Sequence, residues 1–228
     1  MSARLLHCVW LAGPKSALVR RAQASWRTFL PRFEVREWKA AALTGESFCG
    51  WTIPPYVHAA LAAKKWAFAS DWMRFAALYA EGGVYLDCDV ELKRAPTAED
   101  WPEGEWVASE TLIDGSVRVN PGSGMALAKG SAVAAAMLDY YATAAFDDTQ
   151  TVGEILVRVL AEKGLAIARL PPEVMSPVGI DGRPRLSART VAIHHYAMSW
   201  AGPRRRLAKW LSWHGMRFLV DFYLRHRR

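Results

Sequence analysis

The segment KKWAFASDWMRFAALYAEGGVYLDCDVEL, residues 64–92, joins a helix pattern, a glycine stop and a short strand that ends in two aspartates. Aromatic and apolar residues recur here at helical spacing, and with the Ala-rich lead-in they predict one helix over about 56–81. Gly82-Gly83 ends this helix, because a glycine just past the last turn easily adopts a left-handed backbone. Residues 84–87 begin apolar and β-prone, so we expect a buried strand there.

Asp87 and Asp89 stand at the carboxyl end of this strand. In an open α/β sheet, ligands bind at that edge because the loops leave a crevice there. An Asp-x-Asp pair supplies hard oxygen ligands that suit Mg²⁺ or Mn²⁺ together with a diphosphate. Asp71 and Arg74 share one face of the preceding helix, which can turn toward the same crevice. The segment therefore predicts a metal and diphosphate site, although Asp71 and Arg74 alone could form a surface ion pair.

The remaining elements indicate an α/β protein with one catalytic body. Alternating strands and helices predict a mainly parallel central sheet flanked by helices. A chain of 228 residues can bury one such core, so we expect a catalytic domain over 1–202 and a separate tail, 203–228. The other expected strands are 4–11, 33–38, 105–109, 125–128, 166–170 and 190–195, and the other expected helices are 16–29, 131–146 and 151–163.

The positive charge is concentrated in the tail. The net charge is +7, yet residues 203–228 hold eight Lys/Arg and one Asp, which leaves 21 basic and 21 acidic residues in 1–202. Apolar residues alternate with the basic ones, which predicts a basic amphipathic C-terminal helix on an anionic membrane surface. Packing of this helix on the body or on a partner subunit is the alternative. We expect no nucleic-acid binding, because no recognition motif accompanies the basic residues.

Cysteine usage and the N-terminal residues bear on location. Cys8, Cys49 and Cys88 are odd in number and show no paired spacing, which argues against a disulfide framework and a structural zinc site. The apolar stretch 5–12 is too short to span a bilayer and has no cleavage-site pattern. We therefore expect a cytoplasmic protein that is peripheral on the inner face of the cell membrane if the tail binds lipid.

Several separated motifs occur in the same order as in one enzyme family. They are His7, Trp10 and Gly13-Pro14, then Ser25-Trp26, then Ser70-Asp71, Arg74, Tyr79, Gly82-Gly83 and Tyr85 to Asp89, then Asn120, and finally His194-His195-Tyr196 with Ser199-Trp200. Together they resemble the DXD-motif sugar transferases of glycosyltransferase family 32, which includes initiating mannosyltransferases and capsular polysaccharide transferases. The resemblance covers about residues 4–202.

This resemblance implies a GT-A (Rossmann-like) glycosyltransferase fold and a metal-dependent, retaining hexosyltransferase. The donor would be a UDP- or GDP-sugar, the acceptor a glycan, polysaccharide or lipid-linked molecule, and the cofactor Mn²⁺ or Mg²⁺. Golgi members of the family carry a membrane anchor ahead of the catalytic domain, and none is visible here, which favours a bacterial enzyme.

The resemblance also implies roles at the metal and the diphosphate. Asp89 would be the best metal ligand, and Asp87 would contact the metal through water or hold the ribose or sugar of the donor. His194 or His195 would be a further ligand, since a neutral imidazole suits Mn²⁺, although both histidines could be structural. Asp71 would accept hydrogen bonds from sugar hydroxyls. The implied catalytic residues are Asp71, Arg74, Asp87 and Asp89, with Arg74 holding the donor phosphates or sugar.

Further residues are implied to contact the donor. Trp10, at a strand end, could stack on the nucleotide base, although a core position is the simpler alternative for one of eleven tryptophans. Tyr85 could contact the donor or only pack. Asn120 would contact the sugar, and Ser199 and Trp200 would close over the diphosphate. Pro121-Gly122 follows Asn120 where many members differ, so the local turn is expected to depart from the family.

Two other classes share part of the pattern. Phosphohydrolases of the haloacid dehalogenase type also end a strand in D-x-D, and Asp147-Asp148 could serve as their later acidic pair. That class places Thr or Val two residues past the second Asp, where this chain has Glu91. A non-catalytic, membrane-associated protein with a sugar-nucleotide fold is the other alternative.

Overall fold

The computed structural model describes residues 4–11, 13–112, 114–178, 183–197 and 211. Apart from residue 211, the predicted tail 203–228 lies outside this part of the chain, as do Ser199 and Trp200. Within the described part, no helix is long and apolar enough to cross a membrane.

The elements alternate as the sequence predicts, with several short strands added. The first half contains β1 (Leu5–Trp10), α1 (Ala17–Phe29), β2 (Glu34–Lys39), η1 (Ala40–Leu43), β3 (Ser47–Phe48), β4 (Trp51–Thr52), α2 (Pro55–Ala62), α3 (Trp66–Glu81), β5 (Gly83–Tyr85) and β6 (Val90–Leu92). The second half contains β7 (Trp106–Thr111), β8 (Val117–Val119), β9 (Met125–Leu127), α4 (Ala132–Thr143), α5 (Val152–Lys163), β10 (Ala168–Leu170), α6 (Pro172–Met175) and β11 (Ala192–His194).

The central sheet has the strand order β10-β7-β9-β5-β1-β2, with β8 paired to β7. β1 is parallel to β2 and to β5, and β10 is parallel to β7. β9 runs antiparallel to both of its neighbours, β5 and β7. Every strand along this order except β9 therefore points the same way, and the predicted mainly parallel α/β sheet is confirmed.

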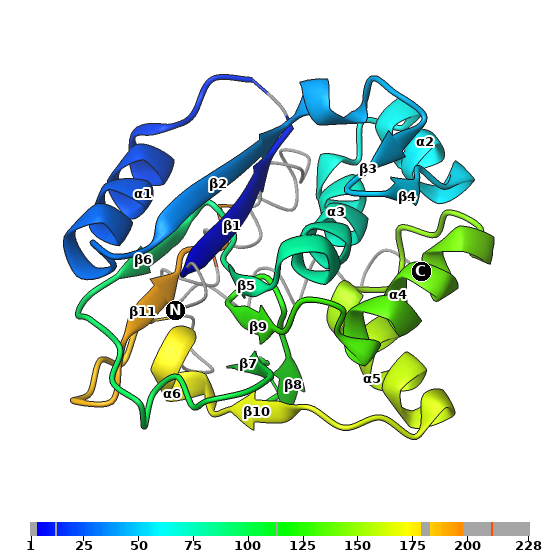
Figure 1. Ribbon diagram of the computed structural model, residues 1–228. Coiled ribbons are helices and arrows are strands. Elements are labelled where there is room, and N and C mark those ends of the chain that lie inside the picture. The colour runs from blue at the N-terminus through cyan, green and yellow to red at the C-terminus, as the bar shows by residue number, and fades with distance from the viewer. Residues whose placement is uncertain (1–3, 12, 113, 179–182, 198–210, 212–228) are drawn as a thin grey trace.

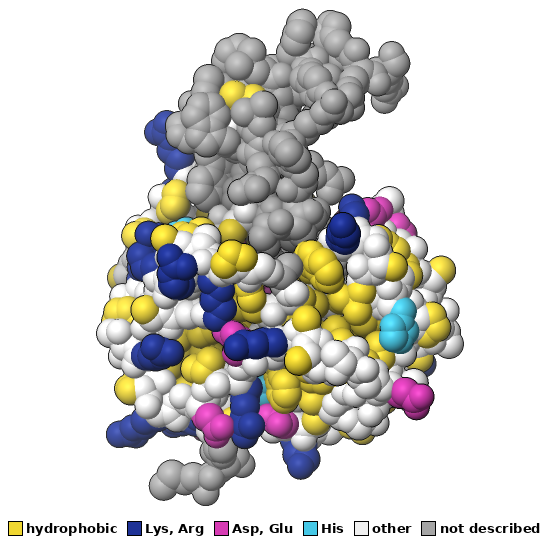
Figure 2. Space-filling view, turned by 90° about the horizontal axis from the view of Figure 1, so that it is seen from above, with side chains coloured by type: hydrophobic (Ala, Val, Ile, Leu, Met, Phe, Trp, Pro, Cys, Tyr) yellow, Lys and Arg dark blue, Asp and Glu magenta, His cyan; other side chains and the backbone are white. Residues whose placement is uncertain are grey.

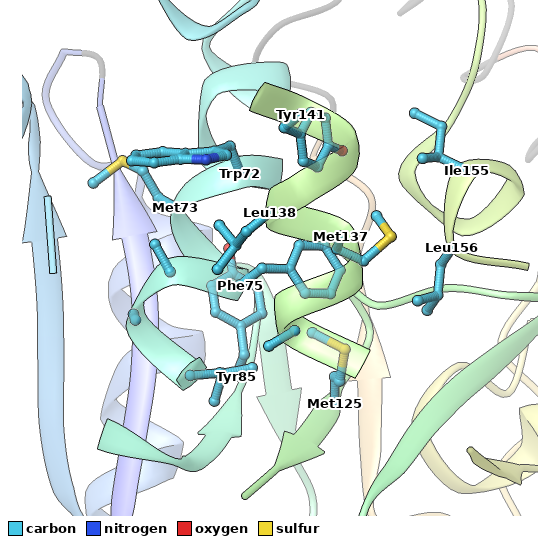
Figure 3. Close-up of a cluster of buried hydrophobic side chains, with 14 of the residues drawn as sticks. Trp72, Met73, Phe75, Tyr85, Met125, Met137, Leu138, Tyr141, Ile155 and Leu156 are labelled. Carbon is cyan, nitrogen blue, oxygen red and sulfur yellow. The ribbon is translucent and has the colours of Figure 1, made fainter. Parts of the chain in front are cut away.

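Helices cover both faces of the sheet (Figure 1). Helices α2 to α5 lie on one face and bury the larger apolar cluster, in which Trp72, Phe75, Met137 and Leu156 meet (Figure 3). Helices α1 and α6 lie on the other face together with β6 and β11, and Trp26 belongs to that second cluster. Both faces of the sheet are thus packed against helices, and the loops lie at the carboxyl edge of its parallel strands.

The helix predicted over 56–81 is wrong as a single element, because two helices occupy this range. The backbone at Lys64 has a φ of 56°, a left-handed conformation that ends α2 before α3 begins. Alanine and lysine both favour helix, so the local composition conceals this break. The predicted stop at Gly82 is confirmed. Gly82 has a φ of 70°, and a side chain there would meet the backbone nitrogen of Lys129 at 2.7 Å.

The strand predicted over 190–195 forms, as β11, but it joins β6 rather than the central sheet. The two strands pair antiparallel, with His194 opposite Val90 and Ala192 opposite Leu92. Because β6 starts directly after the Asp87-Cys88-Asp89 turn, this pairing carries residues from the end of the described chain to that turn.

Surface charge is distributed over the body. On the face shown in Figure 2, Lys and Arg side chains are scattered among hydrophobic and acidic ones rather than gathered in a single patch. This scatter agrees with the equal numbers of basic and acidic residues in 1–202.

Candidate active site

A cavity of about 770 Å³ opens beside the carboxyl end of β5. Its walls come from the end of β1, from α3, from the β7–β8 hairpin, from the start of α5 and from β11. Asp87 and Asp89, in the turn between β5 and β6, lie on the wall of this cavity. The aspartate pair therefore lies at the carboxyl end of its strand, as the sequence predicts.

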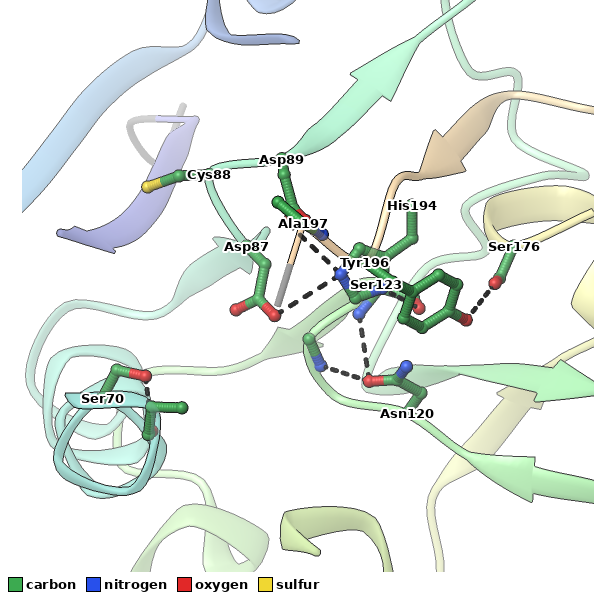
Figure 4. Close-up of polar contacts among 12 residues, drawn as sticks. Ser70, Asp87, Cys88, Asp89, Asn120, Ser123, Ser176, His194, Tyr196 and Ala197 are labelled. Atoms are coloured by element: carbon green, nitrogen blue, oxygen red, sulfur yellow. Dashed lines mark hydrogen bonds and ion pairs between the residues drawn. The ribbon is translucent and has the colours of Figure 1, made fainter. Parts of the chain in front are cut away.

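Asp87, Asp89 and His194 form one cluster, with ligand atoms that all lie within 4.8 Å of one another. The Nε2 atom of His194 is 3.3 Å from an oxygen of Asp89 and 3.7 Å from an oxygen of Asp87 (Figure 4). Two carboxylates and an imidazole suit Mn²⁺ or Mg²⁺. Within the described residues, the side chains therefore fit the divalent cation that the sequence predicts.

The charges within this cluster support one another. Burial alone would raise the pKa of Asp89, but His194 and the backbone N–H of Ala197, 2.6 Å away, outweigh burial and lower the pKa to about 2. For His194 the balance is the reverse, because burial lowers its pKa while Asp89 and Asp87 raise it more. The carboxylates thus favour positive charge between them, which is also what a cation site requires.

His195 lies outside the cluster. Its Nε2 atom is 2.7 Å from Glu91 Oε2, and the same carboxylate contacts Lys93 at 2.7 Å and Arg21 at 3.4 Å. The backbone N–H of His195 donates to the carbonyl of Asp89. Of the two histidines that the sequence left open, the geometry favours His194 as the ligand, and His195 instead links β11 to β6.

Arg74 connects the helix to the aspartates. Its Nη2 atom is 2.5 Å from Asp71 and 3.6 Å from Asp87, and its guanidinium lies 4.5 Å above the ring of Tyr85. Only 3% of Arg74 is exposed, so the surface ion pair considered from the sequence is wrong. Two of its nitrogens, Nε and Nη1, have no hydrogen-bond partner among the described residues. Arg74 also lines the cavity, so its positive charge would attract an anionic ligand bound there.

Asp71 is buried on the same wall of the cavity. Burial raises its pKa to about 6, Arg74 opposes this rise, and Asp87 adds to it. At neutral pH the side chain is therefore mostly an ionised hydrogen-bond acceptor, and modest acidification neutralises it.

The remaining predicted donor contacts differ in what the structure shows. Trp10 lines the cavity and donates its ring N–H to the carbonyl of Gly13 at 2.9 Å. Tyr85 is 1% exposed and donates its hydroxyl to Asp87 at 3.0 Å, so it supports the aspartate. Asn120 lines the cavity, but its amide is already engaged, as it donates to Glu110 and accepts from two backbone N–H groups.

Three residues in or beside the cavity were given no role from the sequence: Glu110 and Tyr196 line it, and Ser123 is buried next to it. Glu110 is buried and accepts hydrogen bonds from Arg118 at 2.6 Å and from Asn120 at 2.9 Å. Tyr196 stacks on His194 with ring centroids 4.0 Å apart, and Ser123 bonds the same histidine. Glu110 directly follows the strand predicted over 105–109, so the rule that singled out Asp87 could have found it. Tyr196 belongs to the closing His194-His195-Tyr196 motif, although no role was inferred for it, and Ser123 carries no comparable signal.

Comparison with known proteins agrees with this geometry. Residues 16–110 match the model of a family described as the glycosyltransferase sugar-binding region containing a DXD motif. The match covers less than half of the chain and contains the Asp-Cys-Asp sequence at 87–89. The matched residues include Asp71, Arg74, Asp87 and Asp89, whereas His194 lies outside them. A comparison with curated proteins gave no match.

Two solved structures share the fold. The PaToxG glycosyltransferase is similar with a TM-score of 0.54 and 17% identity, over 71% of this chain and 70% of that one. A glycosyltransferase involved in the glycosylation of the major capsid of PBCV-1 is similar with a TM-score of 0.50 and 11% identity, over 91% and 99%. The predicted glycosyltransferase-type α/β fold is confirmed.

Proposed function

We propose that the chain is a metal-dependent, retaining glycosyltransferase of the family 32 type, which moves a sugar from a UDP- or GDP-sugar to a glycan or lipid-linked acceptor. The observation that carries the proposal is the joining of two groups in one cavity. The Asp87, Asp89 and His194 cluster stands next to the buried Asp71–Arg74 pair, and Arg74 reaches toward both Asp71 and Asp87. Oxygen ligands beside an unsatisfied guanidinium suit a nucleoside diphosphate and its sugar.

Each cavity side chain would contact a different part of the donor or the metal. Asp87, Asp89 and His194 would hold Mn²⁺ or Mg²⁺, which when bound neutralises negative charge on the departing diphosphate. The positive charge of Arg74 would hold the phosphate or sugar oxygens of the donor, and its contacts with Tyr85 and Asp71 fix the orientation of the guanidinium. Asp71 would accept a hydrogen bond from a sugar hydroxyl. Trp10 would provide the wall for the base.

If the reaction is retaining, the partners of the cavity carboxylates argue against a covalent intermediate. Asp71 is held by Arg74, and Glu110 by Arg118 and Asn120. Both carboxylates would have to leave strong partners to attack the sugar. We therefore favour a front-side reaction in which the acceptor hydroxyl approaches on the face of the leaving group and passes its proton to the diphosphate. A covalent intermediate on Asp71 is the alternative.

The decisive experiment is donor turnover. We would incubate the chain with a panel of UDP- and GDP-sugars and Mn²⁺ and follow release of nucleoside diphosphate with and without glycan acceptors. Metal-dependent release from at least one donor is expected, and it should fall strongly in an Asp89→Asn variant. If no donor is bound or hydrolysed in the presence of metal, the transferase proposal is wrong.

The same assay addresses the phosphohydrolase alternative. Asp148 forms an ion pair with Lys65 at 2.6 Å, and Asp147 accepts from Thr149 and Gln150, so neither joins the metal cluster. Hydrolysis of simple phosphomonoesters without nucleotide-sugar turnover would nevertheless establish that activity.

We extend the proposal to a cytoplasmic enzyme that is peripheral on the membrane. Its support is the composition of residues 203–228, since clustered Lys/Arg near an anionic surface contribute about 1 kcal/mol each. Co-sedimentation with anionic liposomes, with and without 203–228, tests this. Equal partitioning of both forms would contradict membrane binding through the tail.

A further inference from the structure

A turn between β8 and β9, residues 120–123, contacts both halves of the proposed metal cluster. The backbone N–H of Asp87 donates to the carbonyl of Gly122 at 2.9 Å. The hydroxyl of Ser123 is 2.9 Å from Nδ1 of His194. Asp87 and His194 are more than one hundred residues apart in the sequence, so this turn is one of the places where the structure joins them (Figure 4).

The contact at Ser123 determines which ring nitrogen of His194 faces the carboxylates. Ser123 is fully buried, and its oxygen occupies the Nδ1 side of the ring. Nε2 lies on the other side, 3.3 Å from Asp89 and 3.7 Å from Asp87. A neutral imidazole carries one N–H, so a proton on Nδ1 that is donated to Ser123 leaves the lone pair of Nε2 for a metal.

The turn is also shaped to fit Asp87. An added Cβ at Gly122 would collide with the carboxylate of Asp87, so a larger residue there displaces a proposed ligand. Asn120 holds the turn closed, because its side-chain oxygen accepts from the N–H of Gly122 at 3.0 Å and of Ser123 at 3.3 Å. Its amide nitrogen donates to Glu110, which anchors the turn to β7.

We propose that the 120–123 turn is the positioning element of the metal site, with Ser123 as the residue that orients His194 for metal binding. This inference rests on the proposed metal-dependent function and adds residues that the sugar-binding motif does not contain. Asn120, which the family resemblance assigns to the donor sugar, acts in this proposal through the turn. Ser123 is a positioning residue, because it contacts a ligand and no reacting atom.

The test is direct measurement of Mn²⁺ binding without any sugar donor. Loss of a group that orients a metal ligand typically weakens metal affinity about 10- to 100-fold, so Ser123→Ala should raise the Kd for Mn²⁺ by that factor. The free Mn²⁺ signal in electron paramagnetic resonance gives the Kd. Ser131→Ala is the control, because Ser131 is also buried and its hydroxyl accepts from the backbone N–H of Ala134, away from the cavity. Its Kd should stay within about twofold of that of the unaltered chain.

A second pair of variants avoids dependence on one substitution. Gly122→Ala should weaken Mn²⁺ binding through Asp87, whereas Gly45→Ala should leave it unchanged, because a Cβ at Gly45 meets no atom within 4 Å. Equal Kd values for the unaltered chain, Ser123→Ala and Gly122→Ala would overturn the inference, as would an equal loss in Ser131→Ala. If the unaltered chain binds no Mn²⁺, the metal-dependent function itself is wrong, and this inference fails with it.

Discussion

Replacing Asp89 with asparagine should separate the charge of this residue from its shape. Asn is nearly isosteric and still offers an oxygen to the N–H of Ala197, which lies 2.6 Å from the Asp89 carboxylate. The pKa of Asp89 falls from an ordinary 3.8 to about 2, and each pKa unit corresponds to about 1.4 kcal/mol. Ionised Asp89 therefore stabilises the metal-free chain by about 2 kcal/mol at neutral pH.

The sign of this contribution sets its pH window. Because the folded-state pKa is the lower one, the stabilisation is fully present above about pH 4 and disappears as the pH falls through 2. At pH 7, Asp89→Asn should lower the Tm by about 4–8 °C, since 1 kcal/mol corresponds to roughly 2–4 °C for a chain of this size. At pH 3 the difference between the two proteins should be clearly smaller.

Mn²⁺ should widen the difference at neutral pH. A ligand at one hundred times its Kd stabilises the folded state by about 2.7 kcal/mol, and only the chain with an intact cluster gains this. The gap between the two proteins should therefore grow from about 2 to about 5 kcal/mol. Thermal unfolding followed by fluorescence, with Mn²⁺ or with chelator, measures both values. A Mn²⁺-induced rise in Tm that is equal in Asp89→Asn and in the unaltered chain would refute the assignment of Asp89 as a ligand.

Three further outcomes follow from buried charges. Arg74→Lys should weaken donor binding by about 1.5–3 kcal/mol, because an ammonium cannot contact Asp71 and the ligand at the same time as a planar guanidinium does. Calorimetry measures this loss, and a donor Kd within twofold of the original would contradict it. Donor affinity should also decline as the pH falls through about 6, since protonation of Asp71 removes a hydrogen-bond acceptor. The Asp71→Asn variant should lack this decline. If both proteins show the same pH profile, Asp71 is not the cause of the decline. Asp100→Asn should cost about 1–2 kcal/mol of unfolding free energy at pH 7, because hydrogen bonds from Arg94 chiefly hold the pKa of Asp100 down to about 2. That loss should fade on acidification toward pH 2 while Mn²⁺ binding stays normal, and a change in Mn²⁺ affinity would show that Asp100 reaches the site.

The fold was predictable where one segment carries its own pattern. Gly82 follows a run of helical periodicity, and its left-handed backbone ends α3 as the sequence indicates. The break at Lys64 was not predictable, because lysine has no intrinsic preference for φ of 56°. Local backbone hydrogen bonds close α2 there, since the N–H groups of Lys64 and Lys65 donate to Leu61 and Ala60. The reversed strand β9 was equally hidden, since strand direction depends on partners and the local sequence does not encode it.

The residues of the candidate site also differ in whether the sequence alone could identify them. Asp71, Arg74, Asp87 and Asp89 belong to one continuous segment, so their spacing already suggested one site. The choice of His194 over His195 needed the end of β11, where His194 lies opposite Val90 and close to Asp87 and Asp89, whereas His195 contacts Glu91. Ser123 needed the path of a turn that no short motif describes.

The pairing of β11 with β6 also bears on how the protein folds. The two strands are about one hundred residues apart in the sequence, so their pairing costs loop-closure entropy before any stabilising contact forms. Contacts between such distant residues form slowly during folding. During synthesis, the aspartate turn emerges long before His194. A nascent chain can therefore form the sheet around β1 and β5 before His194 reaches the proposed metal site. If that site binds Mn²⁺, tight binding requires that β11 has paired with β6.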